Sequence, residues 1–209
     1  MLRIIYRGGY NKYNEESIKK SVVFDYKDIV KNLIKKDLKI AFVTLAKPDG
    51  YYEEMLSPFV SKHVDVIDST FKGKILWPRY SLIFLLGGNQ EMLKKGLVEG
   101  NFDVSELSSK NVIVGDSAGA FVMGSYMYIN KGKYPGENVI FEEGFYPNSN
   151  VIVIAHGNNQ NYVSEKLVKK VEKFAQRKGI KVLKLNENEE KLLNEEGKFV
   201  SFLKEKLFE

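Results

Sequence analysis

Short apolar runs rich in β-branched residues alternate along the chain with longer amphipathic segments. Several of these runs are continuously apolar, as in LIFLL, NVIVG and NVIVIA, which is typical of strands covered by helices on both faces. The pattern predicts strands at Leu2–Tyr6, Lys39–Leu45, Val64–Ile67, Ser81–Leu86, Asn111–Val114, Val151–Ala155, Lys181–Leu185 and Lys198–Phe202.

Helical periodicity fills most of the intervals between these strands. Tyr162–Lys178 carries apolar residues at steps of three or four, which form one apolar stripe. Further helices are predicted at Tyr26–Lys36, Tyr51–Lys62, Gln90–Glu99 and Gly119–Tyr126. The stretch Lys131–Asn150 has little periodicity, and we expect a short hairpin there, near a functional edge.

The alternation of strands and helices predicts the fold class. Such a pattern implies right-handed crossovers between parallel strands. We therefore expect an α/β three-layer sandwich, with a mostly parallel, doubly wound sheet and helices on both of its faces. The chain has 209 residues and no repeat or Pro-rich linker. This length suits one domain, so residues 1–209 are expected to form a single domain.

Composition removes several classes of site. There is no cysteine, which excludes disulfides, thiolate metal sites and a cysteine nucleophile, and the two histidines are too few for a multi-histidine metal site. We expect neither a metal nor an organic cofactor. The net charge of +5 comes from lysines interspersed with acids, without a basic run, so nucleic acid is not an expected partner.

The N-terminal stretch lacks the apolar core of a secretory signal, and no apolar run of 18 residues occurs. The sequence therefore predicts a cytoplasmic protein without membrane association.

The segment NVIVGDSAGAFVMG runs from an apolar strand through a turn into an apolar helix. The string GDSAG at positions 115–119 matches G-x-S-x-G, in which a serine on a sharp strand-to-helix turn presents its hydroxyl group to a cleft. An ordinary serine-containing turn is the alternative, but the flanking strand and small residues favour a nucleophile. We predict that Ser117 is the nucleophile and that the amide of Ala118 stabilises an oxyanion.

Two other strand ends carry candidate residues. LIFLLGGNQ ends in Gly87, Gly88 and Asn89, where the glycines allow close approach of the backbone to a ligand. The amide of Gly88 is the expected second oxyanion donor; the alternative is a tight turn in which Asn89 caps the next helix. His156 ends the run NVIVIAH and is the expected base, in preference to His63, which precedes a different strand. Ligands in open α/β sheets bind beyond the carboxyl ends of strands, where these groups would meet.

Three strings together resemble a known family. The Gly-Gly-Asn turn at 87–89, GDSAGA at 115–120 and AHGN at 155–158 have the order and separations of the aspartyl dipeptidase (dipeptidase E) and cyanophycinase group of serine peptidases. The resemblance covers most of the chain and implies a class I glutamine amidotransferase-like fold. It implies the same roles for Ser117, His156, Gly88 and Ala118. The α/β-hydrolases share the order of serine before histidine, but 209 residues are few for that fold.

Two features depart from the family pattern. The dipeptidases place an aspartate about fifteen residues after the serine to orient the histidine, and no carboxylate stands there in this chain. Counting back from Gly144-Phe145 brings Glu137 close to that position, so Glu137 is the predicted orienting acid, with Glu142 and Glu143 as alternatives and Asp116 regarded as structural. The arginine that pairs with an acidic substrate side chain is also missing, although Lys166 offers a positive charge.

These observations predict a serine peptidase that hydrolyses small peptides or isopeptides through an acyl-enzyme on Ser117, with His156 as base. Asn89 and Asn158, which belong to the matching strings, are the expected substrate-binding residues. Two alternatives stay open: a catalytically altered relative that binds a peptide or metabolite in the same cleft, and an esterase or amidase built on the same serine turn.

Overall fold

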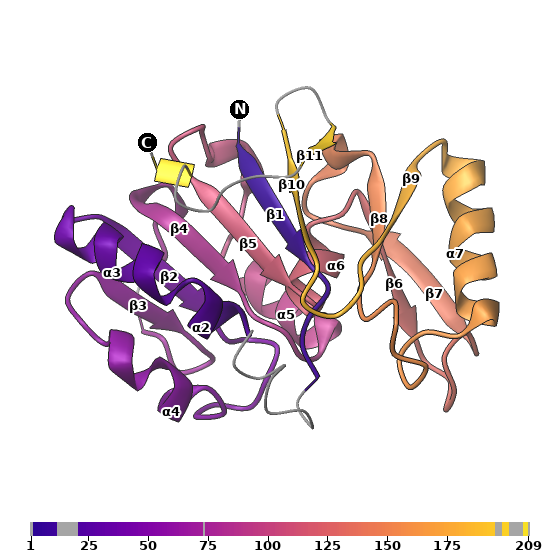
Figure 1. Ribbon diagram of the computed structural model, residues 1–209, viewed down its shortest axis with the longest axis horizontal. Helices are drawn as coiled ribbons and strands as arrows, with labels where there is room; N and C mark the ends of the chain where they lie inside the picture. Colours follow the sequence, from indigo (N-terminus) through magenta and orange to yellow (C-terminus); the bar gives the residue numbers. More distant parts are fainter. Residues whose placement is uncertain (1, 12–20, 73, 195–197, 201–206, 209) are drawn as a thin grey trace.

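The computed structural model describes residues 2–11, 21–72, 74–194, 198–200 and 207–208 (Figure 1). Strands and helices alternate along most of this length. The strands are β1 (Arg3–Arg7), β2 (Lys39–Val43), β3 (Val64–Ile67), β4 (Tyr80–Leu85), β5 (Val112–Asp116), β6 (Tyr126–Asn130), β7 (Val139–Glu143), β8 (Val151–Ile154), β9 (Lys181–Lys184), β10 (Glu190–Leu193) and β11 (Phe199–Val200). The α-helices are α2 (Val22–Asp25), α3 (Lys27–Lys35), α4 (Glu53–Leu56), α5 (Gln90–Glu99), α6 (Ala118–Val122) and α7 (Glu165–Lys178).

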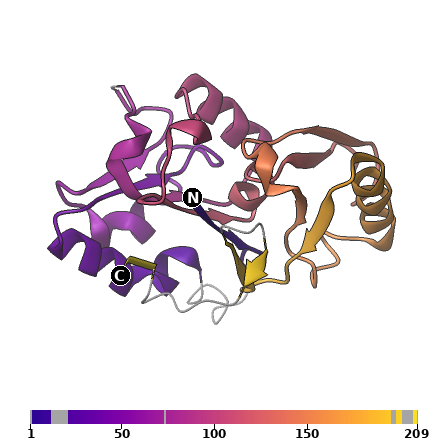
Figure 2. The same ribbon diagram turned by 90° about the horizontal axis from the view of Figure 1, so that it is seen from above.

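The main sheet has seven strands in the order β11-β10-β1-β5-β4-β2-β3. The five strands from β1 to β3 in this order are parallel to their neighbours, whereas β10 and β11 join the β1 edge in antiparallel orientation. In Figures 1 and 2, α2 and α3 lie on one face of this sheet and α5 and α6 on the other. The carboxyl ends of β1, β4 and β5 consequently lie next to one another at one edge, where a ligand site is expected.

A second sheet of four strands, in the order β7-β6-β8-β9, lies beside the main sheet and is covered by α7 (Figure 1). β8 is parallel to both β6 and β9, and β7 is antiparallel to β6. Because β8 and β9 are parallel neighbours, the loops that follow them leave the sheet at the same edge.

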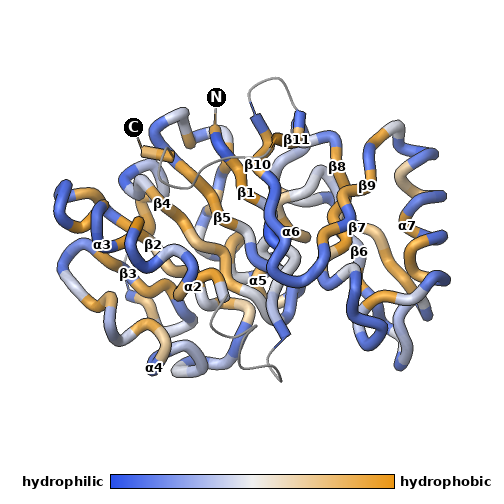
Figure 3. The backbone as a smooth tube through the Cα atoms, in the orientation of Figure 1, coloured by the Kyte–Doolittle hydropathy of each residue, from blue (hydrophilic) through white to orange (hydrophobic). Residues whose placement is uncertain are grey.

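Apolar side chains on both faces of the main sheet form the core, and the hydrophobic colour runs along its central strands in Figure 3. Leu82 and Phe84 of β4 belong to a cluster with α2 and α3, whereas Ile83 and Leu85 belong to a cluster with α5 and α6. The second cluster continues into β6, β8 and α7, so both sheets share one core. Burial on both faces explains why these strands are continuously apolar.

The predicted α/β class, with a mostly parallel main sheet and helices on both faces, is confirmed. The sequence did not indicate that the strands divide between two sheets. Gln90–Glu99 is a helix with the predicted bounds, but the helix predicted at Tyr51–Lys62 contains only α4 and a short 3₁₀ turn, in which Pro58 follows Ser57. Part of the strand predicted at Lys198–Phe202 lies outside the described residues.

The helix predicted at Gly119–Tyr126 ends earlier, at Val122. Tyr126 instead begins β6, which forms a hairpin with β7. The turn and β7 lie within Lys131–Asn150, where we expect a hairpin, but β6 precedes that stretch. None of the helices in the described part of the chain has the length and apolar character needed to cross a lipid bilayer.

Candidate active site

Ser117 lies on a sharp turn between buried β5 and α6. Its backbone has φ 51° and ψ −102°, a strained conformation for a residue with a side chain. A Cβ on Gly115 would lie 2.6 Å from the carbonyl oxygen of Gly119, and one on Gly119 would lie 2.0 Å from that of Leu85. Both glycines of the G-x-S-x-G string are therefore required because backbone segments meet there.

His156 follows β8 and reaches Ser117 across the sheet edge. Its Nε2 lies 2.9 Å from Oγ of Ser117. The ring is buried and stacks on Tyr162, with ring centroids 4.5 Å apart. The structure thus brings together the predicted nucleophile and base, which are 39 residues apart in the sequence.

The end of β1 and the residue that follows it hold the backbones of Ser117 and His156. The amide of Ser117 donates to the carbonyl of Arg7, and the amide of His156 donates to the carbonyl of Gly8. His156, like Ser117, has a positive φ, of 55°. The carbonyls of two consecutive residues, the last of β1 and the one after it, therefore stabilise both unusual backbone conformations.

Glu187 orients the histidine. Its Oε1 lies 3.0 Å from Nδ1 of His156 and also accepts a hydrogen bond from Nδ2 of Asn159 at 2.8 Å. The amide of Glu187 donates to Oδ1 of Asn158 at 2.8 Å, which fixes the loop between β9 and β10. With a carboxylate on Nδ1, the neutral imidazole carries its proton there and presents Nε2 as an acceptor to Ser117.

The prediction that Glu137 orients His156 is wrong, because Glu187 occupies the position beside Nδ1. Glu137 lies in the β6–β7 hairpin, where its carboxylate accepts a hydrogen bond from the amide of Tyr134. Neither alternative fills the role: Glu142 pairs with Lys94 at 2.7 Å, and Glu143 is exposed at the end of β7.

A sequence signal for Glu187 did exist. Glu187 follows the predicted strand Lys181–Leu185, just as His156 follows Val151–Ala155, and adjacent parallel strands bring such ends together. The string NENEEKLLNEEGK resembles a solvated charged stretch, which conceals the carboxylate of Glu187, whose side chain is only 9% exposed.

The turn after β4 lies opposite the histidine. Gly88 has φ 144°, and a Cβ there would lie 2.2 Å from the carbonyl oxygen of Ala46. The hydroxyl group of Tyr52 donates to the carbonyl of Gly87 at 2.7 Å, which fixes the orientation of the Gly87–Gly88 peptide. Ala118 is the first residue of α6, where a helix leaves the amide without an intrahelical acceptor. The oxyanion role of Gly88 and Ala118 stays a prediction.

Asn89 and Asn158, the two predicted substrate-binding residues, accept hydrogen bonds from backbone amides of the protein itself. Asn89 caps α5, and its Oδ1 accepts hydrogen bonds from the amides of Glu91 and Met92. Asn158 supports the amide of Glu187. Neither asparagine lines the two hollows that open beside Ser117 and are described below. The capping alternative therefore holds for Asn89. Asn158 instead holds the loop that carries Glu187.

The remaining candidates lie elsewhere. Nδ1 of His63 is 3.4 Å from the carboxylate of Asp37, remote from the serine turn, and Lys166 lies exposed on α7. No group of three or more histidine, aspartate or glutamate side chains in the described ranges is arranged to hold a metal ion.

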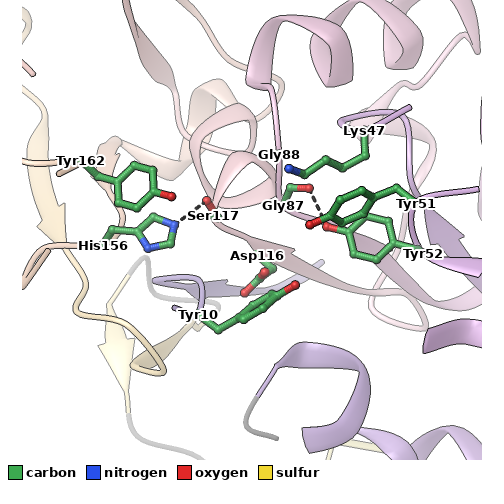
Figure 4. A pocket seen from close by; sticks show the side chains of 10 residues that line it. All are labelled: Tyr10, Lys47, Tyr51, Tyr52, Gly87, Gly88, Asp116, Ser117, His156 and Tyr162. Atoms are coloured by element: carbon green, nitrogen blue, oxygen red, sulfur yellow. Dashed lines mark hydrogen bonds between the residues drawn. The ribbon is translucent and has the colours of Figure 1, made fainter. Parts of the chain in front are cut away.

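Two hollows open beside the Ser117–His156 pair. The first hollow, of about 160 Å³, contains Tyr10, Lys47, Tyr51, Tyr52 and Asp116 in its lining (Figure 4). The second hollow, of about 260 Å³, is lined partly by Gln90, Phe121, Tyr128, Asn130 and Lys133. Gly88, Ser117, His156 and Tyr162 line both hollows, so the nucleophile lies between them. Compared with known proteins, the chain matches no family model and no curated sequence.

Proposed function

We propose that this protein is a serine hydrolase that cleaves small peptides or isopeptides through an acyl-enzyme on Ser117. One observation carries the proposal: Oγ of Ser117, the imidazole of His156 and the carboxylate of Glu187 form a continuous chain with separations of 2.9 Å and 3.0 Å. A serine hydroxyl group is activated when a base lies within hydrogen-bond reach of it and a third group orients that base.

In the first half of the reaction, Nε2 of His156 takes the proton of Ser117 while Oγ attacks the substrate carbonyl carbon. The amides of Gly88 and Ala118 would donate to the oxyanion that forms. Nε2 then gives its proton to the leaving amine, and the acyl group stays on Oγ. Water, activated by the same nitrogen, hydrolyses the ester and restores Ser117.

The hollows support a small substrate. Each is smaller than the roughly 300–1,000 Å³ of many ligand pockets, and the nucleophile lies between them. An acyl group on one side and a leaving group on the other, each about one residue in size, fit this arrangement.

Labelling with a fluorophosphonate probe tests the proposal. The probe should form a covalent adduct with the unaltered protein and none with Ser117→Ala, and tryptic mass spectrometry should place the adduct on Ser117. The absence of an adduct on the unaltered protein, or its persistence in Ser117→Ala, would overturn the proposal. Turnover of simple esters without any dipeptide hydrolysis would select an esterase.

A missing orienting acid would favour the alternative of a catalytically altered relative. Glu187 supplies a carboxylate at that place, so the observation that favoured this alternative no longer holds.

A further inference from the structure

Asp116 is a buried carboxylate directly before the nucleophile. Only 3% of its side chain is exposed, yet it lines the first hollow with Ser117. Its Oδ1 is 3.6 Å from Nε of Arg7 and accepts no hydrogen bond from the described residues. Burial raises the pKa of Asp116, because removal from water disfavours its charged form, although Arg7 opposes this effect. Such a carboxylate would be stabilised by a further cation.

Gly87 has no side chain that would cover the other oxygen of this carboxylate. A Cβ built on Gly87 would lie 3.3 Å from Oδ2 of Asp116 and 3.3 Å from Cβ of Ser117. Both separations are shorter than an ordinary van der Waals contact, so a side chain on Gly87 would press on both residues. Gly87, Asp116 and Ser117 all line the first hollow, so a substrate group bound in that hollow can lie against Asp116 while its neighbouring carbonyl group faces Ser117.

The rest of the first hollow suits a positive charge on the Asp116 side. Tyr10, Tyr51 and Tyr52 contribute aromatic rings, and Figure 4 shows Tyr10 next to Asp116. Aromatic faces attract cations. The ammonium group of Lys47 lies 4.6 Å from the centroid of the Tyr51 ring, and Figure 4 draws it on the Gly88 side, away from Asp116.

We propose that the first hollow binds an ammonium group of the substrate and that Oδ2 of Asp116 is its anionic acceptor. The substrate class is then a peptide or amide with a free primary amine on the carbon next to the scissile carbonyl, because only such a short connection places the amine beside Asp116 while Ser117 attacks. This proposal rests on the proposed hydrolytic function and adds a requirement for a free amine.

Two diphenyl phosphonates that differ only at one nitrogen provide the test. Both react by attack of a serine Oγ on phosphorus with release of phenol; one carries a free α-amine and the other an N-acetyl group. The unaltered protein should be inactivated at least about tenfold faster by the free amine, as expected for a charge-assisted contact. This ratio should fall towards one in Asp116→Asn and stay unchanged in Asp28→Asn, a control at an exposed position of α3.

A second measurement needs no variant. An amino-acid amide with a free amine should slow labelling of the unaltered protein by a neutral fluorophosphonate, whereas its N-acetyl form should not. Equal protection by the two amides, or equal inactivation by the two phosphonates, would overturn the ammonium site while labelling by the neutral probe still supports the hydrolase. Failure of the neutral probe itself would instead remove the proposed function.

Discussion

The carboxylate of Glu187 lies 3.0 Å from Nδ1 of His156, although 31 residues separate them in the sequence. Removing its charge should weaken the base. We expect Glu187→Gln to lower the rate of fluorophosphonate labelling by about 10³–10⁴-fold, because an amide no longer favours the required tautomer or stabilises the imidazolium. Glu137→Gln is the matched control and should change the rate less than about twofold, since Glu137 only contacts the hairpin. A larger loss in Glu137→Gln would reverse this assignment.

Asn158 should act through Glu187 and not through the substrate. Asn158→Ala removes the acceptor for the amide of Glu187 and should slow labelling in the otherwise unaltered protein. In the Glu187→Gln background the same change should have little further effect, because residues that act as one unit are not additive. Additive losses in the double variant would indicate an independent contact with the substrate.

Gly9 should tolerate no side chain. It has φ 83°, and a Cβ there would lie 2.5 Å from Nε2 of His156. Gly9→Ala should displace the imidazole and abolish labelling of Ser117. Gly179→Ala is the control, since Gly179 has φ 67° with no atom within 4 Å of the added Cβ. It should destabilise the fold by about 1 kcal/mol and leave labelling intact. Normal labelling of Gly9→Ala would contradict the observed packing.

Tyr52 should position the peptide that carries the Gly88 amide. Tyr52→Phe removes the hydrogen bond to the carbonyl of Gly87. We expect labelling to slow by up to about tenfold, less than the about 10²–10³-fold that follows direct loss of an oxyanion donor. Urea unfolding should show a loss of about 1 kcal/mol. Tyr134→Phe, at a position that is 58% exposed, should change neither quantity. An unchanged labelling rate in Tyr52→Phe would remove this role.

Buried tyrosines should make the protein sensitive to alkaline pH. Burial raises the pKa of Tyr80 to about 12 and also raises those of Tyr6, Tyr26 and Tyr128 above the ordinary value of 10.0. The unfolded chain therefore ionises first, so stability is fully present below pH 10 and is lost as the pH rises through the folded-state values. Each such tyrosine should reduce the unfolding free energy by about 1.4 kcal/mol per pH unit in that range.

Urea unfolding at pH 8, 10 and 11 should show this decrease. Absorbance of tyrosinate at 295 nm should report ionisation of the buried groups only together with unfolding. Their titration near pH 10 in the folded protein would contradict the prediction.

Local patterns accounted for most strands, because a run such as LIFLL needs burial on both faces wherever it lies. They accounted less well for the segment after Ser117. A Cβ on Gly124 would lie 3.0 Å from the carbonyl oxygen of Val151, and the amide of Ser125 donates to that carbonyl, so the chain leaves the helix and begins β6. Those contacts come from a distant strand and leave no local periodicity.

The amino-acid sequence alone determined the local structure around Ser117. A strand, a turn with small residues and a helix follow one another directly, and the glycines at 115 and 119 meet a backbone requirement that lies within the motif and its neighbouring strand. Tertiary structure alone decided which carboxylate serves His156. Glu137 and Glu187 both lie in loops, but only the parallel pairing of β8 with β9 brings one of those loops to the imidazole. Which strands pair depends on the packing of the whole chain, so short-range periodicity does not predict it.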